Sequence, residues 1–191
     1  MIRKFTLLCK LNLINNSDFH LFMNAQDSMS ISSEICPSCG AKHLCSFHAF
    51  YNRDLIVIQN NAVVFHDVSI SRVICSSCGH THALLPDTLI PFGSYSLFFI
   101  LNVLRLYFLH SYTVEKLCSL YSISISTLYA WVHLFNKQKA LWLGVLSELE
   151  TSSLSFLSML METSSFPMAF FHAFHVSFLQ QYPFTTLSHL P

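Results

Sequence analysis

Two short cysteine motifs carry the clearest chemistry in this sequence. Each has the form Cys-x-x-Cys-Gly, at 36–40 and at 75–79. Two thiolates on one tight turn can bind the same metal ion, and the glycine that follows accepts a strained φ and lets backbone amides point at sulfur. Two such turns complete the tetrahedral four-sulfur set typical of structural Zn²⁺ sites. The predicted zinc ligands are Cys36, Cys39, Cys75 and Cys78.

Four sulfur ligands indicate a structural zinc, because a catalytic zinc keeps one position for water. The alternatives are a pair of redox dithiols or simply buried cysteines, although a thioredoxin-like motif needs a βαβ context that is lacking here. Three histidines lie near the turns in sequence and could replace or support a ligand: His43, His80 and His82. The remaining cysteines are expected to be buried thiols: Cys9, Cys45 and Cys118.

The segment from Thr113 to Trp131 has the pattern of a helix-turn-helix. Cys118 stands where the helices approach closely, and Ile123 fills the turn. Thr113 and Ser124 are suitable N-caps for the two helices. A buried stripe continues at steps of three and four residues, at Leu128, Trp131 and Phe135. An ordinary helical hairpin is the alternative, because the stripe alone fits both.

The outer face of the second of these helices would meet DNA. Hydroxyl, phenol and imidazole groups can hydrogen-bond to phosphates or bases. The candidate DNA-binding residues are Ser124, Ser126, Thr127, Tyr129, His133, Lys137 and Lys139. Neither Arg nor Lys occurs between Lys116 and Lys137, although arginine makes the commonest contact to guanine. We therefore expect weak DNA binding that depends strongly on salt.

The charge balance supports the same expectation. The chain has ten Lys+Arg and ten Asp+Glu, which argues against a strongly basic surface for nucleic acid. Residues 35–140 hold seven basic and four acidic side chains. Four thiolates around Zn²⁺ carry a charge of about −2, so this part would keep a net charge of about +1.

Strands are expected around and between the cysteine turns. Apolar runs at 55–58 and 62–65, separated by Gln59-Asn60-Asn61, predict a β-hairpin, since Asn tolerates positive φ in the turn. Alternation over 68–74 predicts a third strand. Two prolines and a glycine within 83–93 predict a connection.

From Ser94 onward the apolar period becomes helical, with helices expected at 97–109, 113–121 and 126–143. We therefore predict an α+β fold, in which an N-terminal β-rich zinc ribbon precedes an all-α helix-turn-helix bundle. Four segments follow along the chain: a poorly defined lead-in (1–34), the zinc ribbon (35–93), the helical domain (94–150) and an apolar C-terminal segment (151–191). The changed composition of the last segment allows a degenerate or frame-shifted end, which ordered packing on the long helix would argue against.

The mean hydropathy of +0.48 raises the question of a membrane. The most apolar run, 97–109, has 13 residues, whereas a span needs about 20. The N-terminus lacks the uninterrupted apolar stretch and the small-residue cleavage site of a signal peptide. We expect no membrane span and a cytoplasmic protein.

The order of the motifs resembles the N-terminal part of insertion-sequence transposases. The second cysteine motif continues His-Thr-His-Ala-Leu-Leu-Pro, and a long helix then precedes a helix-turn-helix that ends Thr-Leu-Tyr-Ala-Trp. More closely, residues 34–140 are similar to an uncharacterised bacterial transposase-like family that keeps only this part. The resemblance implies a zinc ribbon and a DNA-contacting helix around 126–133. Ile125 and Ala130 stand where such relatives are often basic.

No enzymatic activity is expected. A transposase nuclease needs about three carboxylates around divalent metal ions. After the helix-turn-helix the acidic residues are Glu148, Glu150 and Glu162, with no strands to present them. The 56 residues after Phe135 are too few for a nuclease domain of ordinary size.

Three functions stay open from the sequence. The first is a DNA-binding protein with structural zinc, related to the N-terminal region of transposases. The second is a protein-interaction module or homo-oligomer that presents the apolar helix 97–109 and the Phe-rich tail to a partner. The third is a non-functional remnant of a mobile element. The first is excluded if the C-terminal segment covers the outer face of 126–133.

Overall fold

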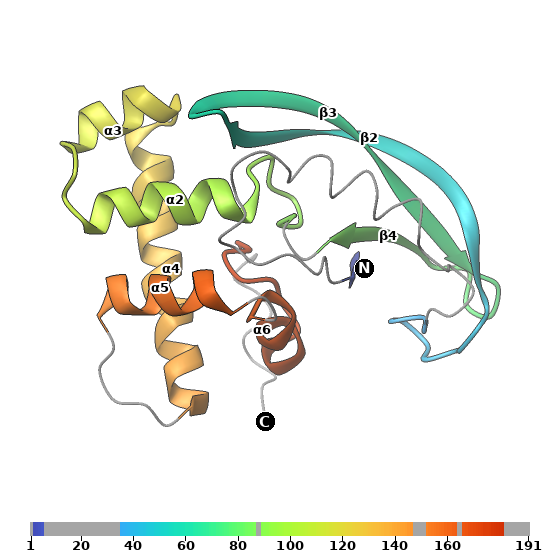
Figure 1. Cartoon of the computed structure of the whole chain (residues 1–191). Helices are drawn as coiled ribbons and strands as arrows, with labels where there is room; N and C mark the ends of the chain where they lie inside the picture. The colour runs from blue at the N-terminus through green and yellow to red at the C-terminus, as the bar shows by residue number, and fades with distance from the viewer. Residues whose placement is uncertain (1, 6–34, 87–88, 147–151, 164–165, 182–191) are drawn as a thin grey trace.

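The computed structural model describes residues 2–5, 35–86, 89–146, 152–163 and 166–181. In this part of the chain a four-stranded sheet of order β1-β4-β3-β2 precedes five helices, which confirms the predicted α+β fold (Figure 1). The strands are β1 (Ile2–Phe5), β2 (Cys45–Gln59), β3 (Ala62–Cys75) and β4 (Thr81–Pro86). The helices are α2 (Leu97–Phe108), α3 (Val114–Tyr121), α4 (Ile125–Leu146), α5 (Ser153–Glu162) and α6 (Phe166–Phe174).

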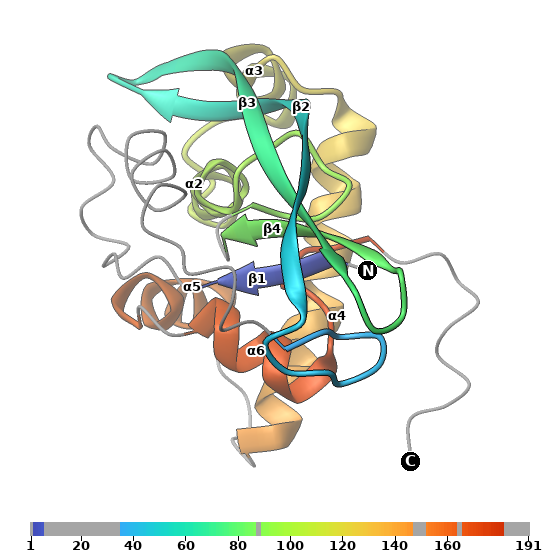
Figure 2. The same cartoon turned by 90° about the vertical axis from the view of Figure 1, so that its right-hand side faces the viewer.

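The hairpin of β2 and β3 dominates the sheet. Its register runs from Cys45 opposite Cys75 to Gln59 opposite Ala62, with one irregularity after Phe47. Asn60 and Asn61 form the turn with φ angles of 51° and 60°, which confirms the turn predicted from the two asparagines. Figures 1 and 2 show the hairpin as a long curved arch that joins the cysteine-containing turns to the helices.

The third strand differs from the sequence prediction. The alternating segment 68–74 is not a separate strand, because β3 continues through it without a break from Ala62. The polar pair His66-Asp67 suggests an interruption in sequence, yet both residues stay paired with β2. The strand that follows is β4, at residues assigned in part to a connection because of Pro86; β4 pairs antiparallel with β3.

Little of the lead-in is described by the structure. Within 1–34 only β1 is described, and it pairs in parallel with β4 from Ile2 opposite Ala83 to Phe5 opposite Pro86. Cys9, predicted to be a buried thiol, lies outside the described residues.

Buried side chains form three clusters along the hairpin. One surrounds the cysteine turns, one lies in the middle of the sheet, and one is the helical core. Along β2, Leu55 and Val57 belong to the middle cluster, whereas Ile56 belongs to the helical core. Both faces of the strand are therefore covered here, which explains the unbroken apolar run at 55–58.

Helix α2 is an internal element. Its N-cap Ser96 accepts a hydrogen bond from the Phe99 amide at 3.1 Å. Its residues from 97 to 104 are buried except Asn102, and α2 and α5 lie side by side across α4 (Figure 1). The fold buries the apolar side chains of 97–104, which argues against the alternative in which this part of the helix is presented to a partner.

The C-terminal segment packs on the long helix α4. Phe156, Phe170 and Phe178 are almost fully buried, and the rings of Phe156 and Phe178 contact Phe135 of α4 with centroids 5.7 and 6.1 Å away. The Gln138 side chain accepts a hydrogen bond from the Leu179 amide. This ordered packing argues against a degenerate end, and these phenylalanines are core residues, not a surface for a partner.

Among the described residues, no single helix combines the length and apolar character needed to cross a membrane. The sharply bent pair formed by α3 and residues Ile125–Gly144 of α4 meets these criteria only when its two helices are taken together.

We predict that Phe178→Ala lowers the free energy of unfolding by about 3–5 kcal/mol, because it leaves a cavity among the aromatic rings of the helical core. Chemical denaturation of the full chain measures this. Phe65→Ala is the matched control: Phe65 is 68% exposed, so we expect a change within about 0.5 kcal/mol. Equal effects of the two substitutions would show that the C-terminal segment is not part of the folded unit.

Candidate metal centre and nucleic-acid interface

The two cysteine turns have the same backbone geometry. The Gly40 amide donates to the Cys36 carbonyl at 2.9 Å, and the Gly79 amide donates to the Cys75 carbonyl at 2.8 Å. The φ angles of these glycines are 73° and 71°, in the left-handed region that disfavours side chains. Both turns therefore require glycine for its φ, as the motif predicts.

Strand pairing brings the two turns together. Cys45 begins β2 opposite Cys75 at the end of β3, and the Ser76 amide donates to the Leu44 carbonyl at 2.9 Å. The base of the hairpin thus places the turn that precedes β2 against the turn that follows β3. Residues far apart in sequence become neighbours through this register.

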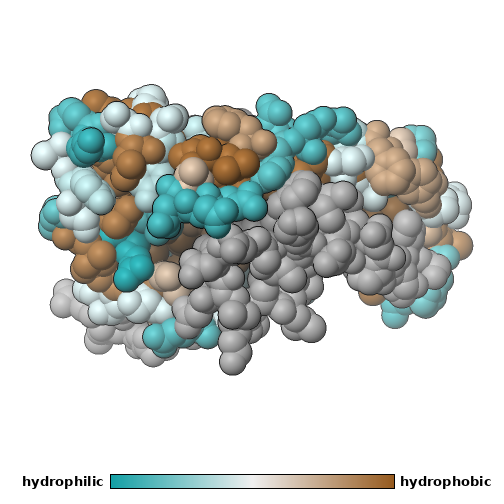
Figure 3. Space-filling model, turned by 45° about the horizontal axis from the view of Figure 1, so that its top comes forward, coloured by the Kyte–Doolittle hydropathy of each residue, from teal (hydrophilic) through white to brown (hydrophobic). Residues whose placement is uncertain are grey.

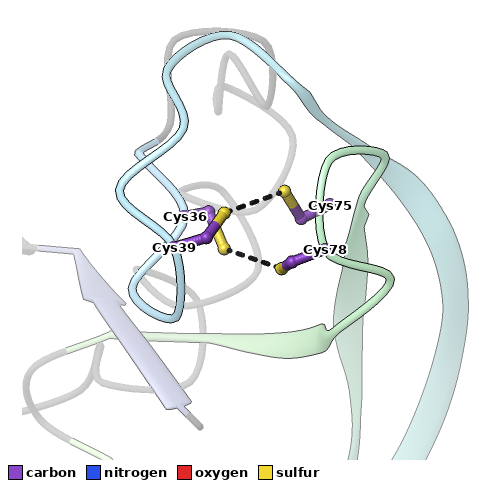
Figure 4. Close-up of side chains that lie close together, drawn as sticks. All are labelled: Cys36, Cys39, Cys75 and Cys78. Atoms are coloured by element: carbon purple, nitrogen blue, oxygen red, sulfur yellow. Dashed lines mark hydrogen bonds between the residues drawn. The ribbon is translucent and has the colours of Figure 1, made fainter.

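The four predicted ligand sulfurs converge at this base (Figure 4). The sulfur of Cys36 lies 3.6 Å from that of Cys78, and the sulfur of Cys39 lies 3.8 Å from that of Cys75. All four sulfurs lie within 4.8 Å of one another. Cys36 and Cys75 are buried, whereas Cys39 is exposed. The arrangement can hold one metal ion.

His82 supports the cluster from β4. It is 1% exposed, and its Nε2 lies 3.3 Å from the sulfur of Cys36. A ring N–H at this position can donate to a thiolate and so orient it. His82 therefore fits the supporting role that the sequence leaves open for the nearby histidines. Cys45 and Cys118 are buried, as predicted.

The crowded thiols have strongly unequal pKa values. Burial opposes ionisation of Cys36, but hydrogen bonds from the Cys39 and Ser38 amides and from His82 lower its pKa to about 5. The His80 amide favours the thiolate of Cys78, yet burial and the three neighbouring sulfurs raise the pKa of Cys78 to about 12. Without a cation, the cluster therefore ionises readily at one sulfur and resists ionisation at another.

A second candidate site lies where α3 meets α4. Thr113 caps α3 by accepting from the Lys116 amide at 3.3 Å, and Ser124 caps α4 by accepting from the Thr127 amide at 3.0 Å. Between the helices Ser122 has a φ of 52°, and Ile123 is 8% exposed. Both caps and the buried turn residue agree with the sequence prediction.

The predicted DNA-binding residues separate into three groups. Ser126, Tyr129, His133 and Lys137 follow steps of three and four along α4, and all four are exposed. The hydroxyl groups of Ser124 and Thr127 lie 2.8 Å apart at the start of the helix. Lys139 points elsewhere, because its Nζ lies 3.4 Å from Ser153 Oγ of α5. No described residue of the C-terminal segment buries the exposed row.

The comparisons with known proteins identify a family but no function. Residues 36–131 match the family described as "Domain of unknown function (DUF6431)", so the chain belongs to this family. The matched part begins at the first cysteine of the cluster and ends in α4. No curated protein matches the chain, and no solved structure matches it.

Metal binding should displace protons from the cluster, and fewer than four per ion. Cys36, with a pKa of about 5, is already a thiolate at neutral pH, whereas Cys78, with a pKa of about 12, must lose its proton. We therefore predict that Zn²⁺ affinity falls as the pH falls from 8 to 6. The slope of log K against pH counts the displaced protons, and it is measured by competition with a chelator.

Cys118→Ser is the control for this measurement, because Cys118 is a buried thiol of α3 outside the cluster. The variant should keep both the affinity and the slope. A slope of four or more, or a slope altered by Cys118→Ser, would contradict the assignment of the displaced protons to the four-cysteine cluster.

Proposed function

We propose that this chain is a DNA-binding protein related to the N-terminal region of transposases. In this proposal a structural zinc ion fixes the base of the hairpin, and α3 and α4 act as a helix-turn-helix that contacts DNA. The observation that carries the proposal is the exposed polar row on α4, which begins just after the turn that holds the buried Ile123.

The geometry of α3 and α4 supports a helix-turn-helix. The chain bends by 102° between these helices, across the three residues 122–124. Helix-turn-helix motifs cross at about 90–120° over turns of three or four residues. Leu117 and Cys118 of α3 and Leu128 of α4 are buried, so the pair is held against the helical core.

The exposed row supplies groups suited to a DNA groove. Hydroxyl, phenol and imidazole groups of Ser126, Tyr129 and His133 can reach phosphates or base edges, and Lys137 extends the row toward the backbone. Ile125, a position often basic in transposase-like relatives, is 45% exposed. With one lysine on this face, phosphate neutralisation is small, so the proposal is weak binding.

The proposed metal is zinc in a structural role. Four Zn–S bonds of about 2.3 Å in a tetrahedron separate the sulfurs by about 3.8 Å. The sulfurs of Cys36 and Cys78 lie 3.6 Å apart and those of Cys39 and Cys75 lie 3.8 Å apart across the two turns, which suits this geometry. A thiolate site of this kind survives in a reducing compartment, so we assign the protein to the cytoplasm.

The proposed role is binding without catalysis. Of the acidic residues after the helix-turn-helix, Glu162 is exposed at the end of α5. Glu148 and Glu150 lie outside the described residues. The proposal therefore assigns no nuclease step to this chain.

Exposed aromatic residues favour one alternative, a protein-interaction role. Phe47, Phe50 and Phe65 of the hairpin are 48%, 61% and 68% exposed, and the rings of Phe47 and Phe50 lie 4.8 Å apart. Such side chains can contact a partner. However, hydrophobic and hydrophilic residues are interspersed over the described part of the face in Figure 3. We therefore favour the DNA-binding role.

Fluorescence anisotropy with a duplex at low salt tests the proposal. We expect binding at micromolar concentrations of the zinc-loaded chain, and a loss of about fivefold or more for the double variant Tyr129→Ala, His133→Ala, because it removes two contacts worth roughly 0.5–1.5 kcal/mol each. Lys137→Gln should also weaken binding and should reduce its salt dependence.

Lys42→Gln is the matched control for Lys137→Gln. Lys42 is exposed beside the first cysteine turn, and that turn lies at the opposite end of the hairpin from α3 (Figure 1), so the substitution removes the same charge away from the exposed row. Undetectable binding by the unmodified chain at low salt would refute the proposal. Equal weakening by Lys42→Gln and Lys137→Gln would refute the assignment of contact to α4.

A further inference from the structure

A cavity of about 460 Å³ opens beside the sheet, and its described lining includes no residue of the cysteine cluster or of the exposed row of α4. Strands β2, β3 and β4 and the segment 92–94 form its walls. Its polar groups come chiefly from two arginines, Arg53 on β2 and Arg72 on β3, together with Tyr51 and Thr81. Neither the metal centre nor the proposed DNA contact uses these residues.

The two guanidinium groups are held in place by neutral partners. Arg72 donates to Thr81 Oγ1 at 2.6 Å, and its guanidinium carbon lies 5.9 Å from the centre of the Tyr51 ring. Its Nε is buried without a hydrogen-bond partner among the described residues. Arg53 donates to the Ile90 carbonyl at 3.2 Å. These contacts orient the two side chains but do not neutralise them.

No carboxylate lines the described part of this cavity. The hairpin has two acidic residues, Asp54 and Asp67, which stand opposite each other in the register. Asp54 follows Arg53 directly, so it points to the other face of the sheet. The Asp67 carboxylate accepts from the Asn52 amide at 2.9 Å on that face. The acidic groups of the hairpin therefore do not compensate the arginines.

Two partly buried positive charges with no carboxylate among the described lining residues are electrostatically unfavourable. Burial lowers the pKa of Arg53, while the neighbouring Tyr51 raises it, and the guanidinium stays charged at neutral pH. A bound anion would offset the solvation that the two guanidinium groups lose on burial. Guanidinium groups present their N–H donors in a planar fork that matches the oxygens of a phosphate group.

We propose that this cavity binds a phosphate group between Arg53 and Arg72. Thr81 holds one of the two guanidinium groups toward it. This site goes beyond the proposed function, since it lies on the sheet and needs neither α4 nor a DNA duplex.

Phe92, at the edge of the cavity, indicates which kind of molecule could bear the bound phosphate group. Phe92 lines the cavity, is 87% exposed, and has a φ of 63°, which projects an aromatic ring from a strained backbone position. An aromatic face of this kind can stack on a base. The cavity volume exceeds that of inorganic phosphate alone, so a nucleotide or the phosphorylated end of a DNA strand also fits.

Isothermal titration of the full zinc-loaded chain tests the proposal. The probes are inorganic phosphate, deoxyadenosine 5′-monophosphate, and a short single-stranded oligonucleotide with or without a 5′-phosphate. We expect at least one phosphate-bearing probe to bind, and Arg53→Gln or Arg72→Gln to weaken that binding about tenfold or more, as removal of a hydrogen bond to a charged group does. Arg105→Gln, at an exposed arginine in the last turn of α2, should leave it unchanged.

The zinc content and thermal unfolding of each variant show whether it is folded, and Phe92→Ala provides a second substitution at an exposed side chain. If a nucleotide is the ligand, Phe92→Ala weakens the binding of deoxyadenosine 5′-monophosphate and leaves the binding of inorganic phosphate unaffected. If only the oligonucleotide with a 5′-phosphate binds, the source is a strand end. Binding by none of the probes would overturn the proposal, as would equal affinity in the folded Arg53→Gln and Arg72→Gln variants.

Discussion

The convergence of four sulfurs at the base of one hairpin is the constraint on which the structure depends. Strand register places the two cysteine turns against each other, and their glycines allow the backbone to curl around the sulfurs. Without a cation the four sulfurs resist ionising together, since burial and the three neighbouring sulfurs raise the pKa of Cys78 to about 12. A divalent cation relieves this conflict, because it stabilises all four thiolates together.

The hairpin connects the cysteine turns to the helices. Toward the end of the hairpin away from the cysteine turns, Ile56 belongs to the helical core. Its neighbours Leu55 and Val57 belong to the cluster in the middle of the sheet. In that core the C-terminal phenylalanines pack on α4, and Gln138 fixes the chain at Leu179. The proposed DNA-contacting row therefore stands on a helix that is held from both sides, and its few positive charges make it a weak contact surface.

Local signals in the sequence predicted much of this arrangement. The spacing of the cysteines, the two asparagines of the hairpin turn, and the caps Thr113 and Ser124 each depend on a few neighbouring residues, so they could be recognised from the sequence. The parallel pairing of β1, the extent of β3 and the burial of the C-terminal phenylalanines depend on tertiary packing. The cavity that Arg53 and Arg72 line left no local signal, because its walls come from β2, β3, β4 and the segment 92–94, which only the tertiary fold brings together.

X-ray absorption spectroscopy of the purified chain at the zinc edge tests the central claim most directly. The account predicts one zinc ion per chain with a first shell of four sulfurs at about 2.3 Å and no nitrogen or oxygen ligand. A shell that contains nitrogen or oxygen, or a folded chain that binds no zinc, would contradict it.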